Sequence, residues 1–385
     1  MQGHLQAASG VWERAARRTR LRTTTTRLAA AVAILLTTLG PGVTPAVAQD
    51  PGERRAPSDA VSVFATVPAP GHPFGIAVGD DRVYVSTSAG DFFADPANGG
   101  HRNSDDERVF TYGEDGELLR TTVIDTQDDA TMGLFGIALD GNPGRRHSLY
   151  VADMNGRILK VGVGAHPAPP TVFSHVPASS GLAGDWMLSM WNDLVFDKAG
   201  NLYVPDDKPR IWRVAPDGTA SIWFADPRLA GLFGFAGGPL GGRIDPTGKW
   251  LYISITLPAE FPFEAAIYRI RLVAHPATSD LELVHRFAFD PSQAPPQASA
   301  IAFAKSGNLY VSLLGTNQVA VLDPAGNEIR RISDPRFNSP WGLAFLGSSL
   351  LVANGDLEPG DNPAAWKVFR VDVGETGLPL NRPRT

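Results

Sequence analysis

The chain has 385 residues, enough for one large domain or two modest ones, and its 43% hydrophobic and 19% charged content is sufficient to bury a sizeable core. It contains no cysteine, which excludes disulfides, thiolate catalysis and zinc–thiolate centres. Beyond residue 48, 28 basic residues face 39 acidic ones, so the formal charge of −11 argues against nucleic acid or an anionic membrane surface as partner.

The first 48 residues have the pattern of an export signal. A basic region at Arg17–Arg27 is followed by an apolar stretch, Leu28–Leu39, that is too short to span a bilayer as a stable helix. The small residues Ala46–Ala48 form a cleavage sequence, so we predict cleavage after them and a secreted or extracytoplasmic protein with no membrane span. The alternative is an uncleaved anchor, and the paired arginines also permit the twin-arginine route. Residues 49–60, polar and charged, are predicted to be a flexible lead-in.

From residue 61 onward one unit repeats six times. Each unit has a Gly-apolar-Ala-apolar strand, a polar turn and a Leu/Val-Tyr-Val strand, with some variation. Intervals of roughly 42 to 61 residues leave room in each unit for four short strands. The six strand pairs are Gly75–Val85, Gly136–Val151, Asn192–Val204, Gly241–Ile253, Ser299–Val311 and Gly342–Val352.

The repeat predicts an all-β protein, a six-bladed β-propeller of four-stranded antiparallel blades over residues 61–375, with a C-terminal tail at 376–385. One blade cannot bury both of its faces, but six arranged radially bury each against its neighbours. We expect Val61–Ala65 to supply the outer strand of the last blade and so to close the ring. A glycine opens the first strand in four units, which lets these strands crowd the axis where a β-carbon would clash. We expect a monomer without a second domain.

The second unit carries the clearest resemblance to a known family. Gly136–Asp140, a turn, Leu149–Asp153 and Asn155–Ile158 closely resemble an NHL repeat. The whole set of units is similar to the senescence-marker-protein/gluconolactonase group of six-bladed propellers, over residues 61–373. The resemblance implies that fold and a lactonase centre, in which a metal at one axial end of the ring polarises the lactone carbonyl and an Asp acts as base. The family's oxygen ligands suit calcium or magnesium, so Ca²⁺ is the cofactor that the resemblance implies.

The positions that would hold this metal match at one place in four. The family's ligands are a Glu before one first strand and Asn and Asp residues at the equivalent place in others. Trp191-Asn192-Asp193 fits the Asn-Asp pair, whereas the remaining positions fall on Pro73-Phe74, Gly241-Gly242 and Ser299-Ala300. Two explanations stay open: the metal site has been lost, or other acidic residues serve.

If other residues serve, the candidates follow the second strands of the units. Asn192 and Asp206 form the best metal-binding pair, because both belong to one unit, and Asp206 and Asp153 are the candidates for a catalytic base. The alternative for Asn192 is an amide that caps a turn, and the alternative for the aspartates is an ordinary turn residue. Similar rim positions are occupied by Asp207, Asn354 and Asp356.

An aromatic residue precedes the first strand in four units: Phe74, Phe135, Trp191 and Trp341. If they share one position in the blade, they form an incomplete aromatic collar at the mouth of the channel. Such a collar offers a stacking surface to a sugar or another flat ligand. The alternative, which we favour, is packing between adjacent blades.

Three function classes therefore compete. The leading hypothesis is a propeller that binds a small molecule or an extracellular protein or glycan and has a degenerate lactonase-type metal site. The second is a calcium-dependent lactonase or esterase-type hydrolase with Asn192 and Asp206 as ligands. The third is a quinone-dependent sugar dehydrogenase, because Ser339–Phe345 resembles a blade opening in those enzymes, although we find no matching His-Arg constellation in the sequence.

Overall fold

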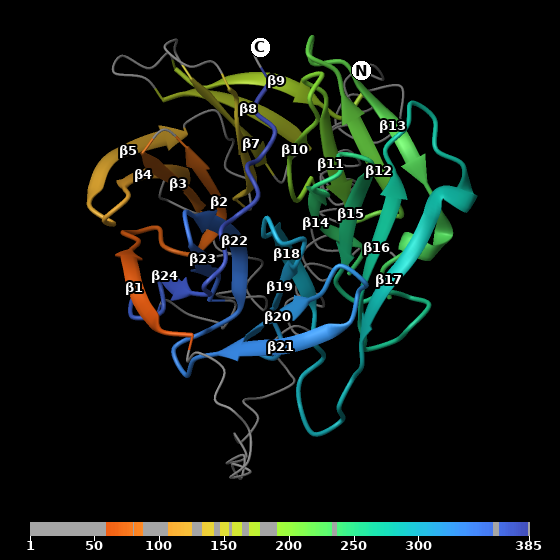
Figure 1. Ribbon diagram of the computed structural model, residues 1–385. Coiled ribbons are helices and arrows are strands. Elements are labelled where there is room, and N and C mark those ends of the chain that lie inside the picture. Colours follow the sequence, from red (N-terminus) through yellow and green to blue (C-terminus); the bar gives the residue numbers. More distant parts are fainter. Residues whose placement is uncertain are drawn as a thin grey trace, which may run out of the picture.

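The computed structural model describes residues 59–79, 81–87, 107–124, 133–141, 147–153, 156–163, 169–177, 191–232, 237–356 and 362–383. They form six four-stranded antiparallel sheets in a ring, which confirms the predicted six-bladed β-propeller (Figure 1). The predicted signal segment and residues 49–58 of the lead-in lie outside this part of the chain. Within these ranges, no helix is long and apolar enough to cross a bilayer.

Blades 1 to 5 each contain four strands that follow one another in the chain. Blade 1 comprises β2 (Pro73–Gly79), β3 (Arg82–Thr87), β4 (Glu107–Gly113) and β5 (Leu118–Ile124). Blade 2 comprises β6 (Leu134–Leu139), β7 (Ser148–Asp153), β8 (Arg157–Gly162) and β9 (Thr171–His175). Blade 3 comprises β10 (Val195–Phe196), β11 (Leu202–Asp206), β12 (Arg210–Val214) and β13 (Ala220–Ala225).

Blade 4 comprises β14 (Pro239–Ile244), β15 (Trp250–Ile255), β16 (Ala265–Arg271) and β17 (Leu281–Phe287). Blade 5 comprises β18 (Ala298–Phe303), β19 (Leu309–Leu313), β20 (Gln318–Leu322) and β21 (Glu328–Ser333). Two short 3₁₀ turns, η4 (Pro227–Leu229) and η5 (Thr278–Asp280), accompany blades 3 and 4. Each blade presents its innermost strand to the axis and its fourth strand to the outside of the ring (Figure 1).

Blade 6 is built from both ends of the propeller. It contains β22 (Pro340–Leu346), β23 (Ser349–Asn354) and β24 (Lys367–Asp372), and its outer strand is β1 (Val61–Thr66). β1 pairs antiparallel with β24 from Val61 opposite Val371 to Thr66 opposite Lys367, which confirms the predicted ring closure. The pairing begins before β1, because the Ala60 carbonyl accepts a hydrogen bond from the Asp372 amide at 3.0 Å. The Asp59 carboxylate ties the same segment to blade 5, where it accepts from Arg330 Nη1 at 2.6 Å.

The first strands share a β-bulge near the axis. In blades 1, 2, 4, 5 and 6, two residues of the first strand lie opposite one residue of the second, for example Phe74 and Gly75 opposite Ser86. A bulge bends a strand and redirects the side chains at that place. The residue before each first-strand glycine lies in the bulge. The bulge therefore determines which side chains face the axis at one end of the channel.

The first-strand glycines are required by close backbone approach. A β-carbon on Gly75 or Gly342 would overlap the carbonyl oxygen of Phe135 or Phe74 on the neighbouring blade. A β-carbon on Gly136 would overlap the backbone of Asp193. This confirms the prediction that glycine lets the first strands crowd the axis.

Serine hydroxyls on second strands join adjacent blades where the first strands are crowded. Ser86 Oγ donates to the Phe135 carbonyl at 2.5 Å, and Ser254 Oγ donates to the Ser299 carbonyl at 2.5 Å. These carbonyls lie in the bulges, where the regular ladder leaves backbone groups unpaired. Much of the remaining contact surface between blades is formed by buried aliphatic and aromatic side chains.

Candidate functional site

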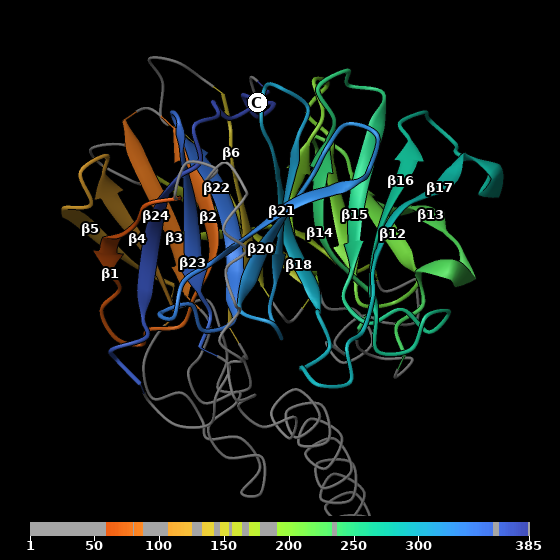
Figure 2. The same ribbon diagram turned by 60° about the horizontal axis from the view of Figure 1, so that its bottom comes forward.

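The axial channel has two ends, which we name by what lies there. The collar face is the end at which the first strands begin, with Phe74, Phe135 and Trp341. The tail face is the end at which the first strands finish, and residues 377–383 cross it. Figure 2 shows this C-terminal segment on one side of the ring, beyond the ends of the strands.

Three of the four predicted collar residues pack against one another. The ring centroids of Phe74 and Trp341 are 4.3 Å apart, those of Phe74 and Phe135 are 5.0 Å apart, and those of Phe135 and Trp341 are 6.0 Å apart. Phe74 and Phe135 are buried. The space enclosed below them is only about 30 Å³, roughly enough for a single water molecule. Their ligand-binding role stays a prediction.

Trp191 belongs to the same buried apolar cluster as Phe74 and Phe135, but its observed ring partner is Trp212, at 5.9 Å. Its side chain is fully buried, and its backbone forms a bridge with Asp206. Blade 3 lacks the glycine that opens the first strand in blades 1, 2, 4 and 6, and its assigned first strand is the shortest. The position before the first strand is therefore not equivalent in all blades.

Asp206, the candidate for both metal binding and catalysis, is held by hydrogen bonds of blade 3. Its Oδ2 accepts from Arg210 Nε at 2.6 Å and from Trp212 Nε1 at 2.7 Å, and its Oδ1 accepts from the backbone amide of Lys208 at 3.1 Å. The carboxylate has no exposed surface. Its observed partners fix the connection between the second and third strands.

Asp153 repeats this arrangement in blade 2. Its Oδ2 accepts from Arg157 Nε at 2.8 Å, and Arg157 follows Asp153 by the same four residues that separate Arg210 from Asp206. Because the same Asp–Arg pair occurs at the same place in two blades, its role in holding the connection between the second and third strands is sufficient to explain it. The catalytic role of either aspartate stays a prediction, and the structure brings neither to the axis.

The structure brings Asn192 to Asp207 rather than to Asp206. Asn192 Nδ2 donates to Asp207 Oδ1 at 3.4 Å and to the Pro239 carbonyl at 3.1 Å. Burial raises the pKa of Asp207 to about 8, and the nearby charge of Asp206 adds to the rise. The Asp207 carboxyl is therefore mostly protonated at neutral pH. Asn192 and Asp207 form a buried polar pair where blade 3 meets blade 4.

The other rim residues lie in or next to blade 6. Asn354 Oδ1 accepts from the Asn338 amide at 3.0 Å, and Asp356 Oδ1 accepts from Asn338 Nδ2 at 2.8 Å. His72 lies against them, with Nδ1 at 3.1 Å from the carbonyl oxygens of Gly355 and Asp356. These side chains fasten the chain that enters blade 1 to blade 6.

A buried ion pair lies inside the channel, and of its two members only Asp193 was named as a candidate from the sequence. Asp193 Oδ2 accepts from Arg243 Nη1 at 2.7 Å and from the Gly242 amide at 3.0 Å, while Asp193 Oδ1 accepts from the Leu194 amide at 2.8 Å. The side chains of Asp193 and Arg243 are 11% and 10% exposed. The guanidinium lines both the narrow space below the collar and the wider space toward the tail face.

The described residues do not fit a calcium ion at the predicted place. Asp193, half of the Asn-Asp match, already accepts hydrogen bonds on both oxygens and is neutralised by Arg243. Asn192 donates its amide hydrogens to Asp207 and to the Pro239 carbonyl, so its nitrogen rather than its oxygen is directed at Asp207. Within the part of the chain that the structure describes, no three His, Cys, Asp or Glu residues gather as a metal centre would need.

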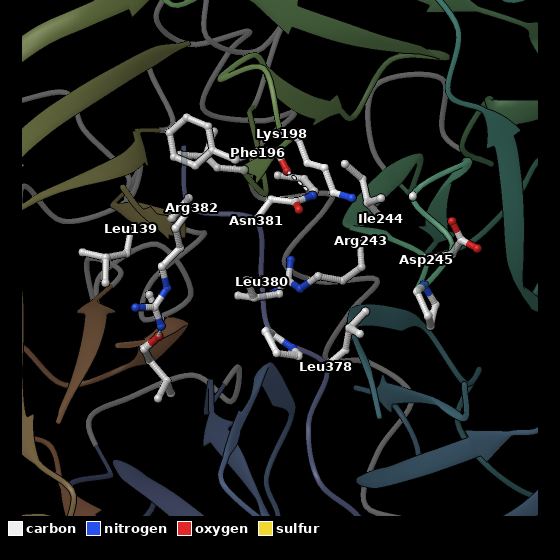
Figure 3. Close-up of a pocket in the computed structure, with 18 of the residues that line it drawn as sticks. Leu139, Phe196, Lys198, Arg243, Ile244, Asp245, Leu378, Leu380, Asn381 and Arg382 are labelled. Carbon is white, nitrogen blue, oxygen red and sulfur yellow. Dashed lines mark hydrogen bonds between the residues drawn. The ribbon is translucent and has the colours of Figure 1, made fainter. Parts of the chain in front are cut away.

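Toward the tail face the channel widens into a cavity of about 300 Å³ (Figure 3). Its wall is mainly apolar and comes from the ends of the first strands of blades 1 to 3, with Ile137, Leu139 and Phe196 among its members. Arg243 reaches into it from blade 4, and the C-terminal segment passes over it. This is the size at which small-molecule sites begin.

The C-terminal segment is anchored on both sides of the channel. On one side, the amides of Gly377 and Leu378 donate to the carbonyls of Gly347 and Phe303. On the other side, Asn381 Nδ2 donates to the Phe196 carbonyl at 3.1 Å, and the Pro383 carbonyl accepts from the Gly141 amide at 2.8 Å. Residues 377–383, predicted as part of a tail beyond the propeller, therefore cover one mouth of the channel (Figures 1 and 2).

No protein-family model and no curated protein sequence matches the chain. Solved structures share the fold. A regucalcin from Agrobacterium tumefaciens, described as a calcium-binding protein, has a TM-score of 0.59 at 17% identity, over 85% of this chain and 98% of its own. A gluconolactonase from Xanthomonas campestris has a TM-score of 0.53 at 17% identity, over 87% and 98%. A luciferin-regenerating enzyme has a TM-score of 0.58 at 14% identity, over 85% and 100%. The expected likeness to gluconolactonase-type propellers is thus confirmed for the fold.

Proposed function

We propose that this gluconolactonase-like propeller is an exported binding protein that takes a small molecule on its axis, and that it has no calcium-dependent hydrolase centre. The N-terminal pattern of a basic region, an apolar stretch and a small-residue cleavage sequence supports export. The observation that carries the binding role is the Arg243–Asp193 pair on the axis, with the 300 Å³ cavity directly beside it.

A guanidinium on the axis changes which ligands the channel favours. An arginine side chain is a cation, and its charge is poorly screened where water is scarce. A divalent cation placed at Asn192 and Asp193 would have to displace this guanidinium from the Asp193 carboxylate, whereas an anion could bind the side of the guanidinium that faces away from Asp193. The residue therefore supplies charge at the place where the related lactonases are expected to hold a metal.

The hydrolase remains the second candidate because of one observation. Asp207 is a buried carboxyl beside Asn192, and its pKa of about 8 is close to that of a general base that works near neutral pH. If this interpretation is right, the catalytic pair is Asn192 with Asp207, and Asp206 supports it from the next position.

Calcium is expected to leave the thermal stability of the mature protein unchanged to within about 1 °C. A ligand that binds only the folded state at 100 times its Kd adds about 2.7 kcal/mol, so 1 mM calcium on a site with a Kd of about 10 µM would raise the Tm by several degrees. The measurement is Tm in 1 mM calcium and in chelator, for the wild type, Asn192→Ala and a surface control, Asn327→Ala. A rise of several degrees that only Asn192→Ala abolishes, together with turnover of a lactone, would overturn the proposed function.

A further inference from the structure

The Arg243 side chain has hydrogen-bond donors for which the described part of the chain offers no acceptor. Among the described residues, all of its hydrogen bonds come from Nη1, which donates to Asp193 Oδ2 at 2.7 Å and to the Gly242 carbonyl at 2.6 Å. Nε and Nη2 donate to no described residue. These two nitrogens form one edge of the guanidinium, and two parallel N–H groups on one edge match the two oxygens of a carboxylate. Figure 3 shows the guanidinium reaching toward the middle of the cavity.

Positive charge predominates around the cavity. Lys198 and Arg382 line it together with Arg243, and among the described residues the one acidic member of its lining is Asp245. The Asp245 carboxylate is occupied by its own turn, where it accepts from the amides of Thr247, Lys249 and Trp250 and from the Thr247 hydroxyl. These hydrogen bonds hold the Asp245 carboxylate in the turn but do not remove its charge. Among the described residues, the three cations Lys198, Arg243 and Arg382 stand against two carboxylates, Asp245 and the Asp193 partner of Arg243. The excess of positive charge attracts an anion.

The rest of the wall selects an apolar body. Ile137, Leu139, Val195 and Phe196 come from the first strands, and Leu378 and Leu380 come from the C-terminal segment. Sulfate or phosphate ions, which need donors on every side, would leave this surface without a partner. A molecule that carries one carboxylate on a small hydrocarbon or aromatic body uses both the wall and the guanidinium edge.

We propose that the tail-face cavity binds a small organic carboxylate with an apolar body, held by Nε and Nη2 of Arg243 and covered by residues 377–383. This assignment rests on the proposed binding function and names its ligand class. It places the ligand at the end of the channel opposite the collar, away from Asn192 and Asp207.

The test is calorimetric titration of the mature protein with matched probes. Phenylacetate and hexanoate carry the proposed features, their amides keep the shape without the charge, and acetate and inorganic phosphate keep a charge without the body. We expect at least one of the two carboxylates to bind with a submillimolar Kd, its amide to bind at least tenfold more weakly, and acetate and phosphate to give no measurable heat.

Variants locate the binding site. Leu380 lines the cavity and is 48% exposed, so its substitution leaves the core intact. Leu380→Glu places a negative charge at the cavity and is expected to weaken carboxylate binding at least tenfold, whereas Leu380→Gln, of equal size, is expected to weaken it by less than threefold. Arg243→Lys keeps a charge for Asp193 but loses the flat edge, and it is expected to weaken binding at least tenfold. Lys305→Ala, on the same face outside the cavity, is the control and is expected to have no effect.

The outcomes separate the ligand class from the proposed function. Equal affinity for the carboxylate and its amide, or binding of phosphate, would overturn the carboxylate assignment and leave a binding protein. Carboxylate binding that Leu380→Glu does not change would overturn the site. If neither carboxylate binds at millimolar concentration, the proposed ligand class is wrong. Calcium-dependent turnover of a lactone would instead contradict the proposed binding function itself.

Discussion

Replacing Arg243 by alanine is expected to lower the free energy of unfolding by about 3–5 kcal/mol. Asp193 would stay buried without its cation, and the loss of one partner from a buried ion pair costs about this much. The measurement is denaturant unfolding at pH 7, compared with Arg331→Ala. Arg331 pairs with Glu328 on the surface, where such a pair contributes about 1 kcal/mol or less.

The double variant Asp193→Asn with Arg243→Met separates charge from packing. It removes both charges and keeps much of the side-chain volume, so it is expected to recover most of the stability that Arg243→Ala loses. A loss of less than about 1 kcal/mol in Arg243→Ala would contradict this interpretation. It would mean that the Asp193 carboxylate is not buried and does not need the charge of Arg243 to compensate it.

Replacing Asp207 by asparagine is expected to stabilise the protein, and increasingly so as the pH rises. The pKa of Asp207 is about 8 in the folded state and close to 3.8 when the chain is unfolded. The folded state therefore holds a proton that the unfolded state releases. The stability contributed by the neutral carboxyl is complete below pH about 4, falls by up to about 1.4 kcal/mol per pH unit above it, and is lost once the pH passes about 8. An asparagine side chain at this position does not ionise and carries no such penalty.

The difference in unfolding free energy between Asp207→Asn and the wild type, measured from pH 5 to pH 9, reports the titration of Asp207 together with its coupling to Asp206. We expect it to grow with pH up to about 8 and then to level off. Asp217→Asn is the control, since hydrogen bonds from Thr219 lower the pKa of that exposed carboxylate and its contribution does not change in this range. A difference that is flat, or that favours the wild type at high pH, would show that Asp207 is charged in the folded state, as a metal ligand would be.

The fold was predictable because its signal is repeated. Six first strands, four of them opened by a glycine and each followed by a second strand, mark the axis of every blade, and the place of Val61–Ala65 before the first unit indicated the strand that closes the ring. The glycines were informative for the same reason, since a β-carbon at Gly75, Gly136 or Gly342 would overlap the next blade. Each of these features can be read from a short stretch of sequence, and the same stretch recurs in successive blades of the ring.

The candidate site was less predictable because it depends on contacts between blades and between distant segments. Asn192 and Asp206 belong to one unit, yet successive side chains along a strand point in opposite directions, so Asp207 rather than Asp206 faces Asn192. The C-terminal residues 377–383 carry no repeat signal, and only the closed ring shows what they cover.

One sequence signal could have identified Arg243. It occupies the third position of the Gly-apolar-Ala-apolar strand, where the other five units have a small residue: Ala77, Ala138, Val195, Ala302 and Ala344. Five small residues around an axis leave an open space, and a single arginine among them places a positive charge in that space. Alignment of the six units by this position, rather than by the expected metal ligands, predicts the axial cation.

The proposed carboxylate site is tested most directly by a crystal structure of the mature protein with 4-bromophenylacetate, in which anomalous scattering locates the bromine. We predict the bromine within the apolar wall formed by Ile137, Leu139 and Phe196, and the carboxylate within about 3.2 Å of Arg243 Nε and Nη2. A ligand found at the collar face beside Asn192 and Asp207, with the tail-face cavity empty of it, would contradict the account.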